Sequence, residues 1–83
     1  MVLVSRDVLV DWAVDALRGL GGQASVLQVS KWIWQNHEGD LRKAGDLLYT
    51  WQYDLRWAGK RLRDLGRLKP VYGERTRPWE LQD

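Results

Sequence analysis

The spacing of the apolar residues constrains this chain more than any other feature of its sequence. Over most of the length they recur every three or four residues, as on one face of a helix, and they alternate only near the C-terminus, as in a strand. We therefore predict that residues 1–83 form a single, mainly α-helical α+β domain. The predicted elements are helices over about 6–18, 26–36, 41–49 and 51–65, a very short strand at 23–24 and a hairpin over about 68–82.

Capping residues predict the ends of the first two helices. Ser5 is expected to cap the first helix, which ends at the glycine-rich residues 19–22. Ser25 followed by Gln28 is typical of a capping box, in which each side chain binds the backbone N–H of the other residue. The second helix should therefore begin directly after Ser25. Its end is placed at residues 36–40, whose polar composition is typical of a turn.

The middle of the chain is compatible with one helix or with two. Asp40 can cap a short helix, which Gly45 weakens. Thr50 can cap a longer helix, which ends at Gly66. Periodicity leaves open whether residues 41–65 form one helix or two. The predicted buried face of the longer helix consists of Trp51, Leu55, Ala58, Leu62 and Leu65.

The composition argues against several classes of function. Six tryptophans and no phenylalanine predict a core of large rings, of which Trp34 and Trp57 are expected to be the most exposed. The chain has no cysteine, and its one histidine, His37, is expected to be a surface turn residue rather than a metal ligand. We therefore expect no enzymatic activity, cofactor or metal. No apolar run approaches the roughly 18 residues of a membrane span, and a cytoplasmic location is expected.

Positive charge is concentrated in one segment of the chain. Residues 56–77 contain eight Lys or Arg and two Asp or Glu, although the net charge of the whole chain is only +2, so the remaining residues are net acidic. A basic segment within an otherwise acidic small domain is typical of a surface that binds a polyanion. This distribution favours nucleic acid over a merely solvated helix face.

Helices followed by a basic hairpin are the arrangement of a winged helix-turn-helix with three or four helices and a C-terminal wing. A helix about 10 Å across fits a major groove about 12 Å wide, so its outward side chains reach the base edges. Arginine can bind guanine with two hydrogen bonds, and glutamine can bind adenine. The sequence therefore predicts double-stranded DNA binding through a recognition helix over about 51–65 and a wing over about 67–77. The candidate DNA-binding residues are Gln52, Tyr53, Arg56, Lys60, Arg63, Arg67, Lys69, Arg75 and Arg77.

The long helix and the wing also resemble a known family. The residues that carry the resemblance are Arg56-Trp57-Ala58, Leu62, Gly66, Leu68 and Trp79-Glu80-Leu81. Over roughly residues 6–81 the chain resembles the winged-helix module at the N-terminus of Mrr-type restriction endonucleases and of related small bacterial or phage proteins. The resemblance implies DNA binding through the third helix and the wing, without the family's cleavage activity. We expect the protein to be a small regulator of transcription or a DNA-recognition module. Gly59 and Pro70 depart from the pattern.

An acidic stripe on the first helix supports an alternative function. Asp7, Asp11 and Asp15 lie four residues apart, opposite the apolar face of that helix, where they would repel DNA. In the alternative, a winged helix docks a protein partner through its first helix and exposed tryptophans. A homodimer is compatible with DNA binding, because two modules bury more DNA surface than one.

Overall fold

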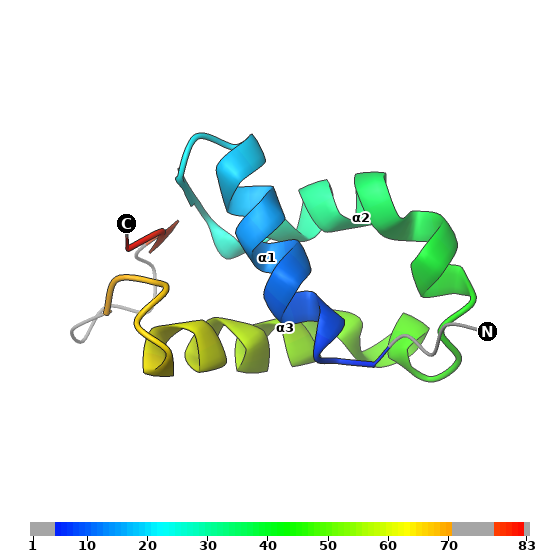
Figure 1. Cartoon of the computed structure of the whole chain (residues 1–83). Coiled ribbons are helices and arrows are strands. Elements are labelled where there is room, and N and C mark those ends of the chain that lie inside the picture. Colours follow the sequence, from blue (N-terminus) through cyan, green and yellow to red (C-terminus); the bar gives the residue numbers. More distant parts are fainter. Residues whose placement is uncertain (1–4, 71–77, 83) are drawn as a thin grey trace.

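Three helices and two short strands follow one another along the computed structural model, which describes residues 5–70 and 78–82 (Figure 1). The mainly helical α+β fold is thereby confirmed. Within the described ranges, no helix is long and apolar enough to cross a membrane. The elements are α1 (Val8–Gly19), β1 (Gln23–Ala24), α2 (Val26–Arg42), α3 (Leu47–Asp64) and β2 (Trp79–Glu80).

One apolar core joins the three helices. It forms because each helix has an apolar face at helical spacing, and these faces can be removed from water only against one another. In Figure 1, α1 crosses both α2 and α3, and each of the three helices contacts the other two. The fully buried side chains of this core are Leu9, Ala13, Ala16 and Leu17 of α1, Val29, Ile33 and Leu41 of α2, and Leu55, Ala58 and Leu62 of α3.

The capping prediction is confirmed for α2 and wrong for α1. The Gln28 backbone N–H donates to Oγ of Ser25 over 3.1 Å, and the Ser25 N–H donates to Oε1 of Gln28 over 2.9 Å. At α1 the N-cap position is held by Asp7, whose side chain makes no capping bond. Ser5 takes part only through its carbonyl oxygen, which accepts from the Val8 N–H over 3.1 Å.

Replacing Ser25 with alanine is expected to lower the free energy of unfolding by about 1 kcal/mol, because the first turn of α2 then loses its capping hydrogen bonds. Urea denaturation followed by circular dichroism measures the change. Ser5→Ala is the matched control and should change the free energy by less than about 0.5 kcal/mol. Equal effects of the two substitutions would contradict the role assigned to the capping box.

The second helix is longer than predicted. Residues 36–40 were expected to be a turn, but α2 continues through them to Arg42, with one non-helical residue, His37, at φ −130° and ψ 19°. The continuation has a clear cause, because Leu41 is fully buried and holds the last turn of α2 against the core. Arg42 also donates from Nε to Oε2 of Glu38 over 2.8 Å, which links successive turns.

The middle of the chain forms one helix, and the short helix at 41–49 is absent. The chain turns after α2, where Gly45 has a φ of +64° that other residues rarely adopt. Helix α3 begins directly after this turn, at Leu47. Thr50 therefore lies inside α3 rather than at its N-cap, and its hydroxyl donates to Oδ2 of Asp54 over 2.8 Å.

The C-terminal segment forms a small antiparallel sheet with the segment after α1. Strand β2 pairs with the predicted strand β1, with Ala24 opposite Trp79. On the other edge of β2, Leu68 forms a bridge with Leu81, and the Lys69 N–H donates to the Glu80 carbonyl over 2.9 Å. The C-terminal strand therefore lies between the segment after α1 and the segment after α3. The tip of the predicted wing, 71–77, lies outside the described residues.

Candidate nucleic-acid interface

One side of α3 presents a continuous row of exposed polar side chains. The opposite side of the helix is anchored in the core, so the helix cannot rotate to bury them. Of the predicted site residues, Gln52, Tyr53, Arg56 and Lys60 all lie on this exposed side. We call this row the α3 ridge and include in it Tyr49, which is 84% exposed. Tyr49 is absent from the predicted set because the helix was expected to start after Thr50, although its place four residues before Tyr53 puts both on one face.

Arg63 was predicted to face outward, but the structure places it against the sheet. Its guanidinium lies 5.7 Å from the centre of the Trp79 ring, and its Nε is buried. Strand β2 lies beside the end of α3, so a cationic side chain at this position covers an aromatic ring. Leu65, predicted to be buried, is 54% exposed. The chain turns at Gly66, and Leu68 fills the core in its place.

The predicted wing residues Arg67 and Lys69 differ in whether their charge is neutralised by an ion pair. Arg67 is exposed directly after α3. Lys69 is also exposed, but its Nζ lies 2.6 Å from Oε2 of Glu80, so its charge is partly neutralised. Arg75 and Arg77 lie outside the described residues. Arg67 is therefore the one described basic residue of the predicted wing that forms no ion pair with another described residue.

A groove runs along one flank of the α3 ridge, between α2 and α3. Its volume is about 930 Å³. The floor is apolar and includes Trp34 and Trp51, whose rings stack with their centres 6.2 Å apart. The rim is polar and contains two cations and no carboxylate. The polar rim residues are Lys31 and Gln35 of α2 and Gln52 and Arg56 of α3.

The other flank of the ridge faces α1 and has a different charge. A smaller hollow of about 330 Å³ lies there, lined by Asp7, Trp57, Lys60, Arg61 and Asp64. Two carboxylates therefore lie close to the cations on this side. The acidic stripe continues along α1, since Asp11 and Asp15 are also exposed. The positive potential beside the ridge is consequently stronger on the α2 flank than on the α1 flank.

Trp34 and Trp57 are among the most exposed tryptophans, as expected, but neither ring is fully exposed. Both are half-buried, as is Trp32, whereas the other three tryptophans are buried. An arginine covers both Trp34 and Trp57: the Arg6 guanidinium lies 4.1 Å from the centre of the Trp57 ring, and that of Arg42 lies 5.4 Å from Trp34. These rings therefore belong to the edge of the core. The large exposed aromatic side chains are instead the tyrosines of the α3 ridge.

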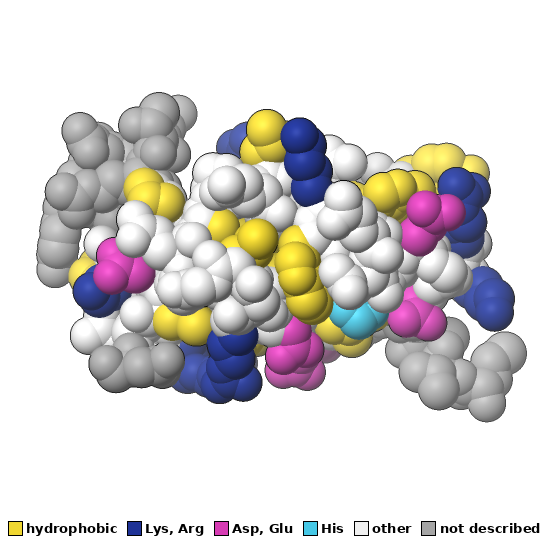
Figure 2. Space-filling model, turned by 90° about the horizontal axis from the view of Figure 1, so that it is seen from above, with side chains coloured by type: hydrophobic (Ala, Val, Ile, Leu, Met, Phe, Trp, Pro, Cys, Tyr) yellow, Lys and Arg dark blue, Asp and Glu magenta, His cyan; other side chains and the backbone are white. Residues whose placement is uncertain are grey.

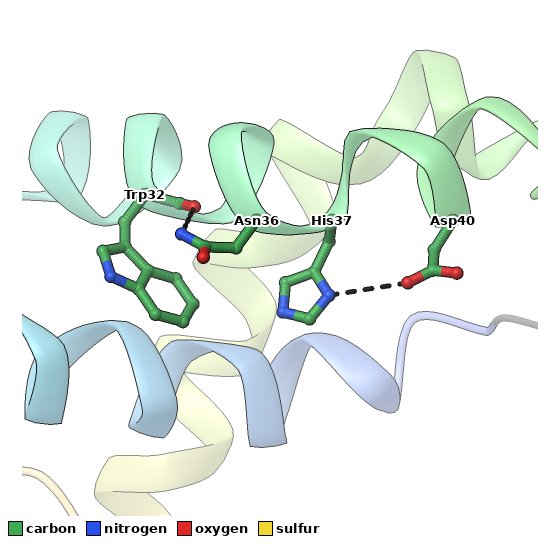
Figure 3. A network of polar contacts seen from close by, with 4 residues as sticks. All are labelled: Trp32, Asn36, His37 and Asp40. Atoms are coloured by element: carbon green, nitrogen blue, oxygen red, sulfur yellow. Dashed lines mark hydrogen bonds and ion pairs between the residues drawn. The ribbon is translucent and has the colours of Figure 1, made fainter.

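His37 is a packing residue rather than a surface turn residue. Its ring stacks on Trp12 of α1 at 3.9 Å and 9° between the planes, and its side chain is 21% exposed. Figure 3 shows His37 with Asp40, whose Oδ2 lies 3.5 Å from Nδ1, and with Trp32 and Asn36 on the preceding turns of α2. Among residues 5–70 and 78–82, no three His, Asp or Glu side chains converge as metal ligands would.

The face formed by α1 and α2 contrasts with the α3 ridge. Figure 2 shows hydrophobic, basic and acidic side chains interspersed over its described part, without one sign of charge prevailing. The α3 ridge and the adjoining groove, by contrast, hold the cations Lys31, Arg56 and Lys60 and no carboxylate. Comparisons of the chain with protein-family models, with curated proteins and with solved structures found no match.

Proposed function

We propose that this protein is a winged helix-turn-helix that binds double-stranded DNA through α3, as a small regulator or DNA-recognition module. The observation that carries the proposal is the α3 ridge. Tyr53, Arg56 and Lys60 lie on one exposed side of a helix whose opposite side is held in the core. Arg56 and Lys60 form no ion pair with any of the described residues. Their charges are therefore available to a polyanion.

The chemistry of the ridge suits the major groove of a duplex. Arg56 can donate two parallel hydrogen bonds to guanine, and Gln52, one turn away, can bind adenine with its amide. Tyr49 and Tyr53 can donate hydrogen bonds to phosphate oxygens or contact sugars with their rings. The helix is 18 residues long, or about 27 Å, which is enough to follow the groove over several base pairs.

The sheet supports the winged-helix form of the proposal. Strand β2 pairs with β1 on one edge and with residues 67–69 on the other, so the described segments on either side of the predicted wing tip, 67–70 and 78–82, lie next to each other. In a winged helix, Arg75 and Arg77 from the sequence between them would contact the DNA backbone beside the recognition helix. Exposed Arg67 would extend the same contact.

Protein docking through α1 is the second candidate function. The observation that favours it is the exposure of all three aspartates of the acidic stripe, Asp7, Asp11 and Asp15. The half-buried tryptophans weaken it, because they offer little free aromatic surface. Two results together would favour this candidate. The protein would retain no DNA, and a protein partner would remain bound after Arg56 and Lys60 are both replaced by alanine.

An NMR titration of the labelled protein with a random-sequence duplex of about 16 base pairs, at two salt concentrations, tests DNA binding. We expect chemical-shift changes at residues 49–60 and around Arg67 that weaken as salt rises. If about five cations contact phosphates, the affinity should fall with salt with a log–log slope on the order of −4 to −5. A measurable affinity with a slope near zero would contradict the electrostatic basis of the proposal.

A further inference from the structure

We propose that the DNA backbone lies on the α2 flank of the α3 ridge, where Lys31 and Gln35 hold a phosphate of the strand that borders the occupied major groove. Neither residue is among the candidates that the sequence suggested. The inference rests on the proposed function, because it states on which flank of the proposed recognition helix, α3, the DNA backbone lies. It adds α2 to the DNA interface and predicts which residues contribute to DNA affinity irrespective of the base sequence.

The charge on the two flanks of the ridge carries the inference. A recognition helix in the major groove has a phosphate backbone on each side, so its two flanks meet phosphates. On the α1 flank, Asp7 and Asp64 line the hollow beside Lys60 and Arg61, so two carboxylates offset the two cations and oppose the close approach of a phosphate. On the α2 flank the groove contains Lys31 and Arg56 and no carboxylate. A backbone strand is therefore accommodated closely on the α2 flank and kept farther away on the other.

The groove offers the donors that a phosphodiester requires. Lys31 and Gln35 are both exposed on α2, four residues apart and therefore on the same side of the helix. An ammonium group and an amide N–H can bind two oxygens of one phosphate or of neighbouring phosphates. Lys31 forms no ion pair within the described residues, so no ion pair with any of them has to be broken. Leu27, which is 62% exposed beside it, can cover the apolar side of a deoxyribose.

The arrangement separates positioning from sequence recognition. Lys31 and Gln35 on the α2 wall would contact the backbone, which is the same for every sequence. Gln52 and Arg56 on the α3 wall remain available for base edges. Lys31→Ala should therefore weaken binding to all duplexes alike, whereas a substitution of Arg56 should also change which duplex is preferred.

The test compares Lys31→Ala with Lys43→Ala in binding titrations against two unrelated duplexes over a range of salt. Lys43 is the matched control, because it is an exposed lysine at the C-cap of the same helix and does not line the groove. We expect Lys31→Ala to weaken binding of both duplexes about tenfold and to reduce the salt slope by about one. Lys43→Ala should leave both quantities close to those of the unchanged protein.

The outcomes separate this inference from the proposed function. Suppose that the unchanged protein binds duplex DNA but the two lysine variants behave alike. The DNA backbone then does not lie in the α2–α3 groove, so the inference is overturned while the proposal of DNA binding stands. Chemical shifts that move at residues 7–15 and not at 27–35 would overturn it in the same way. If the unchanged protein binds no duplex at low salt, both fail. Inorganic phosphate at equal ionic strength should not saturate shifts at Lys31, and saturation would indicate a site for a free anion instead.

Discussion

Replacing Arg56 and Lys60 together by alanine should abolish sequence-specific DNA binding and leave the fold intact. Both side chains are exposed and outside the core, so circular dichroism and the unfolding midpoint should change little. A well-placed contact to a base edge contributes about 1–3 kcal/mol, so losing two should cost about 2–6 kcal/mol of binding free energy. Fluorescence anisotropy with a duplex obtained by binding-site selection measures the loss.

The chain offers a control of identical chemistry for this experiment. Arg18→Ala with Lys43→Ala also removes one arginine and one lysine from exposed positions, so the net charge falls by the same amount. If DNA binding were only an attraction of the whole protein for a polyanion, both double variants would lose affinity equally. A large loss in the ridge variant alone would establish the ridge as the interface. Equal losses would show that α3 does not enter the major groove of the DNA.

The two single substitutions should differ. Arg56 lies beside the α2–α3 groove, which holds no carboxylate, whereas Lys60 shares its hollow with Asp7 and Asp64. The carboxylates offset part of the attraction between Lys60 and DNA, so its removal costs less. Arg56 also has the planar, five-donor geometry that suits a guanine edge, which lysine lacks. The ridge is therefore expected to depend mainly on Arg56.

The sequence predicted those elements whose cause is local. The capping box at Ser25 needs only two residues three apart, and β1 begins directly after the glycines that end α1. The exposed side of α3 followed from helical spacing alone, which placed Arg56 and Lys60 correctly. Local sequence was sufficient in these cases because each feature is determined by residues that lie within a few positions of one another in the chain.

The predictions that failed depend on contacts between distant segments. The polar residues 36–40 look like a turn until the burial of Leu41 and the stacking of His37 on Trp12 are known. Arg63 has the spacing of an outward-facing residue, but Trp79 of β2, which is distant in sequence, lies beside it. The asymmetry of charge beside the ridge also arises only when α1 and α2 pack on opposite flanks of α3. The periodicity of the sequence cannot predict these contacts between distant segments, because it describes each helix by itself.

Gly59 shows how a distant contact reverses the expected effect of a substitution. Within a helix, glycine is about 1 kcal/mol less favourable than alanine, so Gly59→Ala would ordinarily stabilise the protein. In the structure Gly59 is buried under the indole of Trp79, and a Cβ atom would lie 2.5 Å from its Cζ2. We expect Gly59→Ala to destabilise the protein by about 1–3 kcal/mol, because the ring and β2 must move away from α3. For a domain of this size, the melting temperature should fall by roughly 4–24 °C.

Gly39→Ala is the matched control, since Gly39 also lies inside a helix but a Cβ atom added there would meet no neighbouring group within 4 Å. The same change should raise stability there by about 0.5–1 kcal/mol, so the two variants should differ in sign. A second step assigns the cause. In a Trp79→Leu background the indole is gone, and Gly59→Ala should cost much less than in the unchanged protein, which a double-mutant cycle measures. If Gly59→Ala stabilises the protein as Gly39→Ala does, Trp79 does not hold β2 against α3, and other contacts must place the sheet beside α3.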